Sequence, residues 1–455
     1  MALYGLPRWV RTRTVRVVTS AKRATLRGRP GTNMELHRQR IRAAVAPDSE
    51  GVSMPASEQP GHEPDGRPAA AGPLVGLRVL DIGQLLAGPM VGTMLADWGA
   101  DVVKVEQRGV GDPIRKLGSH SGAPLWWKAN GRNKRSIALS LGDPADRDAV
   151  LALARSADVV LENFTPGTLE KWGLGYRELS AANPGLVLLR VSGYGQTGPY
   201  RGKRSFGRSA QSFSGFSSVN GFPDRPPVHP GLPVGDYFAA LTGVGAVLAA
   251  YIERQRSGLG QEIDLSLYEA TFRIMELIAV TYDQEGTVLG REGTSNTYVA
   301  PVGTWRTADN KWFSLTASTQ PVARRLLEVI GGPELADDPR FVDNGSRVAH
   351  REELDQILEK WVAGRTAQEL TAVVDAAGLV SCVELDMSDI FQDPHYEARG
   401  TIQTVADPDL GQIRMSTVVP RFTRTPGAIR WAGETLDASR RDVSEDPDWG
   451  RVELG

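Results

Sequence analysis

Between residues 77 and 195 the sequence alternates between short apolar runs and longer stretches with helical spacing, and this alternation constrains the fold most strongly. A chain that passes repeatedly from strand through helix to strand builds parallel strands, because each helix carries it back to the same edge of the sheet. The sequence therefore predicts an α/β protein with a doubly wound, mostly parallel, Rossmann-like sheet. We expect its strands at 77–83, 101–107, 136–141, 158–164 and 185–195.

Capping signals mark the helices between these strands. The helix predicted over 87–100 ends at Gly99, because glycine readily adopts the left-handed conformation that follows a helix. Asp143 and Pro144 supply a side-chain cap and a first-turn proline for the next helix. A third helix is predicted over 166–182.

The pattern changes after residue 195. A polar stretch leads into an uncharged helix at 237–252, and a strand at 261–267 is followed by an apolar helix at 268–281. A hairpin over 302–317 turning at Asp309-Asn310, with mostly amphipathic helix over 321–377, predicts a second, smaller α+β domain. We divide the chain into a basic extension with a Pro/Gly-rich linker (1–73), a large α/β domain (74–285), the small α+β domain (286–400), and a return to the large domain with a C-terminal tail (401–455).

Charge is distributed unevenly along the chain. There are 52 basic and 54 acidic side chains, but the first 47 residues hold eleven basic groups and a single acid, Glu35. The remaining body has a net charge of −12, which argues against a nucleic-acid partner because such binding depends on neutralising phosphates. The basic head is either an organellar transit peptide or an upstream extension with Met34 or Met54 as the start. We expect a cytoplasmic protein. Import into an organelle would follow only if the basic head is a transit peptide.

Membrane and metal sites are not favoured. The run 237–252 is shorter than the ~20 residues of a membrane span, so we expect a helix buried inside a globular protein. The single cysteine, Cys382, can form neither an internal disulfide nor a thiolate metal site, and we expect it to be buried. The six histidines show no H-E-x-x-H spacing. The sequence thus predicts no membrane contact and no bound metal.

Two segments raise the question of a phosphate-bearing ligand. Gly193-x-Gly195-x-x-Gly198 matches a dinucleotide fingerprint, but Pro199 and a basic loop follow where a helix would have to begin, so this reading is disfavoured. The segment 104–135 holds eight basic side chains and two acidic ones. Because ligands of open α/β sheets bind at the carboxyl ends of strands, this basic cluster indicates either a phosphate-bearing ligand or a solvated charged face.

Asp236 is the candidate catalytic residue. It precedes an apolar helix, where an aspartate usually caps the first turn. This helix start is expected to be buried, however, and the glycines at 231 and 235 leave room for a substrate beside the carboxylate. A desolvated carboxylate can act as a nucleophile toward acyl groups. His229 is interpreted as a solvated loop residue, and no G-x-S-x-G motif indicates a hydrolase.

Seven segments together resemble the family III CoA-transferases, the group that includes formyl-CoA transferase and the carnitine CoA-transferases. They occur in the family's order and near its spacing, mainly over residues 74–275 and more weakly to about 425. They are GLRVLDIGQLLAGP (76–89), GADVVKVEQRGVGDPIR (99–115), NKRSIALSL (133–141), ADVVLENFTPGTLEKWGL (157–174), GYGQTGPY (193–200), PVGDYFAALTG (233–243) and SGLGQEIDLSLYEA (257–270).

The resemblance implies that Asp236 attacks the thioester carbonyl of an acyl-CoA. A mixed anhydride forms and the CoA thiolate leaves, then returns to give an aspartyl-CoA thioester, and an acceptor carboxylate repeats the exchange in reverse. Such a route needs water to be excluded and the reactants to be held close. Backbone N–H groups of glycine-bearing loops would stabilise the oxyanion.

The resemblance also implies a set of CoA contacts and a set of partners. CoA or acyl-CoA would be the substrate, with no permanently bound cofactor, a small carboxylic acid as acceptor, and an interlocked homodimer that buries the apolar helix. Basic members of the contact set suit the phosphates of CoA. By matching position, the contacts fall on Leu86, Ala87, Gln107, Arg108, Leu139, Asn163, Phe164, Lys171 and Arg204.

Three departures from the family leave the acceptor open. Phe206-Gly207 stands where many members have an aromatic residue followed by an acid, 293–301 replaces a poly-glycine loop, and 379–385 replaces a turn of small residues. Two other functions remain as alternatives. One is an α-methylacyl-CoA racemase, whose usual Gly-His-Asp segment is absent from 202–211, and the other is a catalytically silent CoA-binding protein, against which the retention of Asp236 argues.

Overall fold

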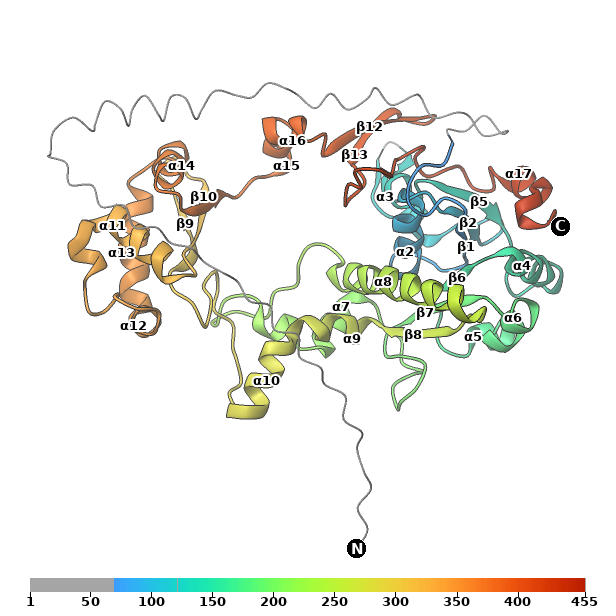
Figure 1. Ribbon diagram of the computed structural model, residues 1–455, viewed down its shortest axis with the longest axis horizontal. Coiled ribbons are helices and arrows are strands. Elements are labelled where there is room, and N and C mark those ends of the chain that lie inside the picture. The colour runs from blue at the N-terminus through green and yellow to red at the C-terminus, as the bar shows by residue number, and fades with distance from the viewer. Residues whose placement is uncertain (1–68, 121, 455) are drawn as a thin grey trace, which may run out of the picture. The chain divides into compact units, whose positions relative to one another are not determined.

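The computed structural model describes residues 69–120 and 122–454, and a six-stranded sheet forms the centre of its α/β part (Figure 1). All the strand pairings in this sheet are parallel, which confirms the predicted sheet type. The predictions for residues 1–68, including the basic head, concern a segment outside the described residues. In spatial order the strands are β5 (Lys134–Ala138), β2 (Asp101–Glu106), β1 (Arg78–Asp81), β6 (Val159–Glu162), β7 (Val187–Ser192) and β8 (Glu262–Ser266).

Helices cover both faces of this sheet. One hydrophobic core lies between the sheet and a first helix layer, and a second core lies on the opposite face, so Val79 and its neighbour Leu80 belong to different cores. Burial on both faces explains why consecutive residues of these strands, such as Val79 and Leu80, are apolar. The first layer contains α2 (Ala87–Asp97), α8 (Val234–Ser257) and α9 (Leu267–Phe272), and the second contains α4 (Pro144–Ser156), α5 (Thr168–Trp172), α6 (Tyr176–Ala182) and α17 (Arg440–Glu445).

Some helix boundaries follow the capping signals and others do not. Gly99 takes a positive φ of 99° after α2, and the Asp143 side chain accepts a hydrogen bond from the Ala145 N–H at 2.9 Å, as expected. The single helix predicted over 166–182 is wrong, because Gly173 with φ 72° separates α5 from α6. The helix predicted over 268–281 is likewise interrupted, by a short 3₁₀ turn between α9 and α10 (Glu276–Glu285).

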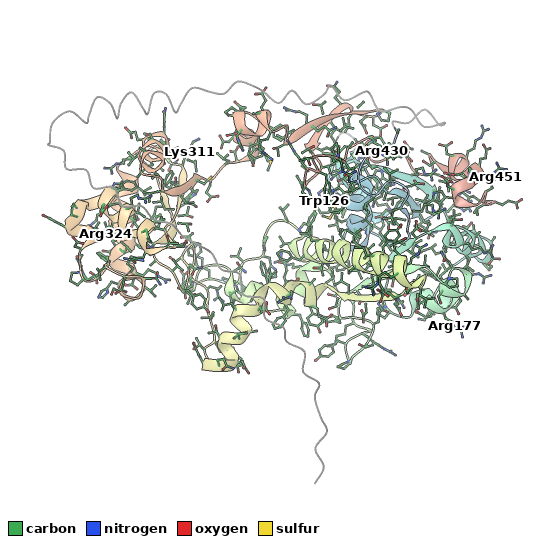
Figure 2. All side chains as sticks on the ribbon, in the orientation of Figure 1. Trp126, Arg177, Lys311, Arg324, Arg430 and Arg451 are labelled. Carbon is green, nitrogen blue, oxygen red and sulfur yellow. The ribbon has the colours of Figure 1, made fainter. Side chains whose placement is uncertain are left out.

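A smaller antiparallel sheet has a hydrophobic core of its own. Its hairpin turns at Asn310, which has φ 66°, as the sequence predicted. Lys311 and Arg324 mark this part of the chain in Figure 2. The strands are β11 (Val380–Val383), β10 (Trp312–Thr316) and β9 (Val302–Arg306), and the helices are α11 (Gln320–Ala336), α12 (Asn344–Ala349), α13 (Arg351–Ala363) and α14 (Ala367–Ala376).

Cys382 is exposed, so the prediction that it is buried is wrong. It lies in β11, the edge strand, whose side chains alternate between exposed and half-buried positions. Register places Cys382 opposite Ser314 on the exposed side of that alternation. One residue earlier or later in the strand would have turned the thiol toward the core.

The remaining segments are short. A two-stranded sheet and two single-turn helices follow β11, and the chain then returns to the six-stranded sheet, where the Asp437 carboxylate accepts a hydrogen bond from the Ala138 N–H at 2.7 Å. This contact covers the outer side of β5. The short elements include α3 (Leu125–Asn130), α7 (Gly207–Phe213), α15 (Met387–Ile390), α16 (Pro394–Ala398), β12 (Ile402–Asp407) and β13 (Gly411–Ser416).

Within the single chain, helix α8 is buried on one face only, so the predicted burial inside the protein holds for that face. Gly243 packs so closely that an added Cβ would lie 3.0 Å from Val91 and 3.1 Å from Leu189. On the other face the side chains of Leu241 and Ile252 are 58% and 65% exposed. By length and composition alone this helix could cross a membrane, but its Gly243 face packs as a core helix does.

Candidate active site

A small pocket of about 40 Å³ lies at the carboxyl ends of β5, β2, β1 and β6. This position includes the point where the strand order reverses, between β1 and β6, which is where ligands of doubly wound sheets bind. Three residues that the resemblance assigned to CoA line it: Gln107, Leu139 and Phe164. The other lining residues are Ile82, Gln84, Val105, Glu106, Leu141, Gly142 and Trp172.

Trp172 forms an aromatic wall of this pocket that the sequence did not indicate. Its ring meets the ring of Phe164 edge to face, with 5.0 Å between the centroids. A Cβ added to Gly142 would lie 3.3 Å from the indole nitrogen of Trp172. The signal that could have identified Trp172 is its place on the helix after β6, next to the predicted contact Lys171.

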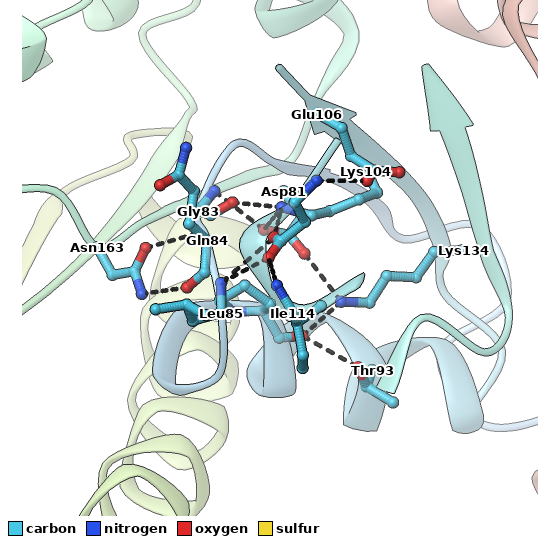
Figure 3. A network of polar contacts seen from close by, with 12 residues as sticks. Asp81, Gly83, Gln84, Leu85, Thr93, Lys104, Glu106, Ile114, Lys134 and Asn163 are labelled. Atoms are coloured by element: carbon cyan, nitrogen blue, oxygen red, sulfur yellow. Dashed lines mark hydrogen bonds and ion pairs between the residues drawn. The ribbon is translucent and has the colours of Figure 1, made fainter. Parts of the chain in front are cut away.

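Leu86, Ala87 and Asn163 surround the turn between β1 and α2. Leu86 and Ala87 are buried at the start of α2. The Asn163 amide accepts a hydrogen bond from the Gln84 N–H and donates one to the Gln84 carbonyl, both at 2.7 Å (Figure 3). Asn163 therefore holds the backbone of a residue that lines the pocket.

The three basic residues assigned to CoA, Arg108, Lys171 and Arg204, do not contact one another. Arg108 donates a hydrogen bond to Asp146 at 2.6 Å. Lys171 is exposed on α5, and Arg204 is exposed in the loop that follows β7. The structure thus brings Gln107, Leu139 and Phe164 into one wall, and leaves Lys171 and Arg204 on two exposed segments.

Most members of the basic cluster at 104–135 are paired inside the protein, so neither a phosphate site nor a solvated face describes them. Lys128, for example, lies 2.7 Å from Asp407, nearly 280 residues later in the chain. The sequence could not show this, because the neutralising acids come from distant segments. The pairs are Lys104 with Asp81 and Asp112, Arg115 with Glu106, Lys128 with Asp407 and Asp409, Arg132 with Asp97, Lys134 with Asp81, and Arg135 with Asp101 and Asp446.

Asp236 is the third residue of α8, and it is half-buried rather than fully buried. Its carboxylate lies directly against Gly207, where an added Cβ would come within 1.9 Å of Oδ2. Gly235 faces the same point, since a Cβ there would lie 2.8 Å from the Gly207 carbonyl oxygen. The two glycines therefore allow α7 and α8 to meet beside the carboxylate.

A series of contacts connects Asp236 to the carboxyl edge of the sheet. Gly193 directly follows β7 and packs against Ser205, whose Cβ would lie 2.2 Å from an added Cβ. Ser205 is two residues before Gly207, which contacts Asp236. Since β7 lies beside β6 in the sheet, Asp236 and the pocket occupy the same edge.

Burial raises the pKa of the Asp236 carboxyl to about 6. Within the described part of the chain, this carboxylate has no basic side chain within 4.0 Å. Position 206, next to the contact with Gly207, holds an exposed phenylalanine, not a histidine. His229 is half-buried and within 3.4 Å of Gln211, so the interpretation as a solvated loop residue was incomplete.

The arrangement is chemically suited to nucleophilic catalysis by a carboxylate. A group with a pKa near 6 is mostly ionised at neutral pH, and burial makes it more reactive than a hydrated aspartate. The residues that the structure describes contain no group of three or more His, Cys, Asp or Glu side chains that could hold a metal ion.

Comparison with known proteins identifies the family. Residues 74–438 match the sequence profile of CoA-transferase family III. The chain is 44% identical over 376 residues to succinyl-CoA–D-citramalate CoA-transferase of Chloroflexus aurantiacus, covering 82% of this chain and 94% of that protein. It is 38% identical to succinate–glutarate CoA-transferase of Agrobacterium fabrum, covering 72% and 84%. A CAIB/BAIF family protein from Brucella suis has a similar structure, with TM-score 0.73, 32% identity, and coverage of 82% and 98%. The chain therefore belongs to family III of the CoA-transferases.

Proposed function

We propose that Asp236 is the nucleophile of an acyl-CoA:carboxylate CoA-transferase and carries the acyl group and then CoA in turn. The carboxylate attacks the thioester carbonyl, and the CoA thiolate leaves with the electron pair of the broken C–S bond. The thiolate then attacks the aspartyl carbonyl of the anhydride, which releases the donor acid and leaves CoA on Asp236. The acceptor carboxylate reverses both steps and regenerates the free aspartate.

One observation carries this proposal: a desolvated carboxylate, with no basic side chain of the described residues within 4.0 Å, lies at the same sheet edge as the pocket. A carboxylate needs no general base to act as a nucleophile, so no histidine is required beside it. A racemase would need such a second group. The nearby positions Phe206 and Gly207 offer none.

We propose small dicarboxylic acids as the partners of this reaction. Relatives are named for succinyl-CoA with D-citramalate, for succinate with glutarate, and for succinyl-CoA with mesaconate. Residues 195–223, which include the contact with Asp236, carry four basic side chains and no acidic one. A second carboxylate on the substrate would be attracted to this segment.

We also propose a homodimer. Helix α10 carries large apolar side chains but has no buried residue in the described chain. Leu277, Val280 and Tyr282 are each more than half exposed. Exposed apolar clusters of this kind mark contact surfaces. The exposed face of α8, with Leu241 and Ile252, is a second apolar surface that a partner subunit would cover. A particle mass of one chain in solution would contradict this part of the proposal.

Trapping the covalent intermediate tests the nucleophile directly. Incubation with succinyl-CoA followed by hydroxylamine should convert Asp236 to a hydroxamate, located by peptide mass spectrometry. Asp224→Asn, a matched control at an exposed loop aspartate, should still give the hydroxamate, and Asp236→Asn should not. A modification at another residue, or none with a donor that turns over, would remove Asp236 from this role.

A further inference from the structure

The turn Gly83–Leu85, between β1 and α2, is held by side chains from three other places in the chain (Figure 3). Lys104 of β2 donates a hydrogen bond to the Gly83 carbonyl, and Asn163 brackets the backbone of Gln84. The Asp112 carboxylate accepts a hydrogen bond from the Leu85 N–H at 3.0 Å. Each of the three successive residues of the turn is therefore fixed by a different side chain.

Leu85 shows that this turn is strained. Its φ is 61°, in the left-handed region that a bulky residue without a special reason avoids. Such a conformation persists only where the surroundings determine it, and it is commonest where a ligand is held. The hydrogen bonds from the surrounding side chains provide that determination.

The charges that hold the turn are buried and balanced. Lys104 Nζ lies 3.5 Å from Asp81 Oδ1 and 3.3 Å from Asp112 Oδ2, and Lys134 Nζ lies 2.9 Å from Asp81 Oδ2. Lys134 also donates a hydrogen bond to the Pro89 carbonyl in the first turn of α2, at 2.6 Å. For stability alone, an apolar cluster would serve as well as these three buried ion pairs, which motivates the search for a role beyond stability.

The turn borders the pocket directly. Ile82, directly before the turn, and Gln84, in its middle, are part of the pocket wall, and the cap residue of α2, Leu86, directly follows the turn. A shift of the turn would therefore move both the wall and the start of α2. The network is placed where it can control the shape of the ligand site.

We infer that Lys104, Asp112 and Asn163 are positioning residues that keep the Gly83–Leu85 turn in the conformation that binds CoA. This inference rests on the proposed function for its ligand. It also gives Asn163 a different role from the direct CoA contact that the family resemblance implied. Binding to a turn that is correctly formed only part of the time weakens in proportion to that fraction.

The double variant Lys104→Met, Asp112→Asn tests this inference. It removes one charge of each sign and leaves the Asp81–Lys134 pair in place, so the buried network stays neutral. We expect the Kd for free CoA, measured by calorimetry, to rise about tenfold. The KM for acyl-CoA should rise by the same factor, with kcat within twofold of the parent value.

Arg132→Met with Asp97→Asn is the matched control. This buried pair, 2.6 Å apart, lies at the opposite end of the same helix α2. It should lower thermal stability and leave the Kd for CoA unchanged. An equal rise of Kd in both double variants would show a general loss of stability and overturn the inference.

Leu85→Gly is a second test that does not depend on removing buried charges. Glycine adopts a positive φ freely, so the variant should fold, but the turn gains freedom and the Kd for CoA should rise about threefold. A folded variant of either kind with an unchanged Kd overturns the inference. Failure of the parent protein to bind CoA overturns the proposed function together with it, whereas CoA binding without trapping at Asp236 affects the proposed function alone.

Discussion

Asp81 and Asp236 are two aspartates at the carboxyl edge of one sheet, and they differ in depth of burial and in their cationic partners. Asp81 is fully buried, which by itself would raise its pKa, but Lys104 and Lys134 outweigh burial and hold the pKa below its usual value. Asp236 is only half-buried, yet burial raises its pKa to about 6, because no basic side chain among residues 69–120 and 122–454 lies within 4.0 Å to offset it. For these two carboxylates the cationic partners, and not the depth of burial, set the direction of the pKa shift.

The largest expected effect is on catalysis at the unpaired aspartate. Asp236→Asn should lower kcat/KM for CoA exchange by about 10³-fold or more, because the proposed nucleophile is removed. Circular dichroism should report an unchanged fold. The Asp224→Asn control should keep parent activity, and a fully active Asp236→Asn would end the comparison between the two aspartates.

The same substitution at the paired aspartate should act on stability. Asp81→Asn leaves two buried lysines with insufficient negative charge, so the free energy of unfolding should fall by about 3–5 kcal/mol. Urea denaturation measures this. A loss below 1 kcal/mol would mean that the ion pairs of Asp81 do not hold the β1–α2 region together.

Gly207 tests the contact that gives Asp236 its place. Gly207→Ala puts a Cβ within 1.9 Å of the present position of Asp236 Oδ2, so the carboxylate must move. We expect kcat to fall about 10- to 100-fold, since small displacements of a reacting group have effects of that size. Gly202→Ala, whose added Cβ meets no atom within 4 Å, is the control and should leave kcat unchanged.

Asp236→Asn should also stabilise the protein at high pH, opposite in sign to Asp81→Asn. The pKa of Asp236 is raised from 3.8 to about 6 by folding, so above pH 6 its charge opposes folding, and below pH 3.8 it has no effect. After allowance for partial exposure, the gain at pH 8 should be about 2 kcal/mol. Urea midpoints at pH 8 and pH 4 measure it, and an equal gain at both values would contradict this origin.

The smallest effect is the pH dependence of the reaction. Because the proposed nucleophile, Asp236, must be ionised to attack and its pKa is about 6, kcat/KM for acyl-CoA should be about tenfold lower at pH 5 than on the plateau above pH 7. A pH–rate profile checks this. A flat profile down to pH 5 would place the pKa of the attacking group near that of an ordinary aspartate.

The sequence predicted the parts of the site that depend on local pattern. Strand–helix alternation gave the parallel sheet, and the resemblance singled out Gln107, Leu139 and Phe164, which share one pocket wall. The sequence analysis did not identify Trp172 in that wall. It also did not identify the buried ion pairs of Asp81 with Lys104 and Lys134. A charged residue within an apolar strand, such as Lys104 in DVVKVE, was the available signal for a buried ion pair.

What the amino-acid order determined by itself was the sheet, its two helix layers and the candidate nucleophile, because each follows from periodicity or from a local motif. Only the tertiary structure decided which charges are paired. The cluster at 104–135 is basic along the chain, but most of its members pair with acids, some as distant as Asp407 and Asp446. Asp236, by contrast, has no basic side chain within 4.0 Å in the described part of the chain. Electrostatic interactions depend on distance in space, and folding sets that distance without regard to separation in sequence.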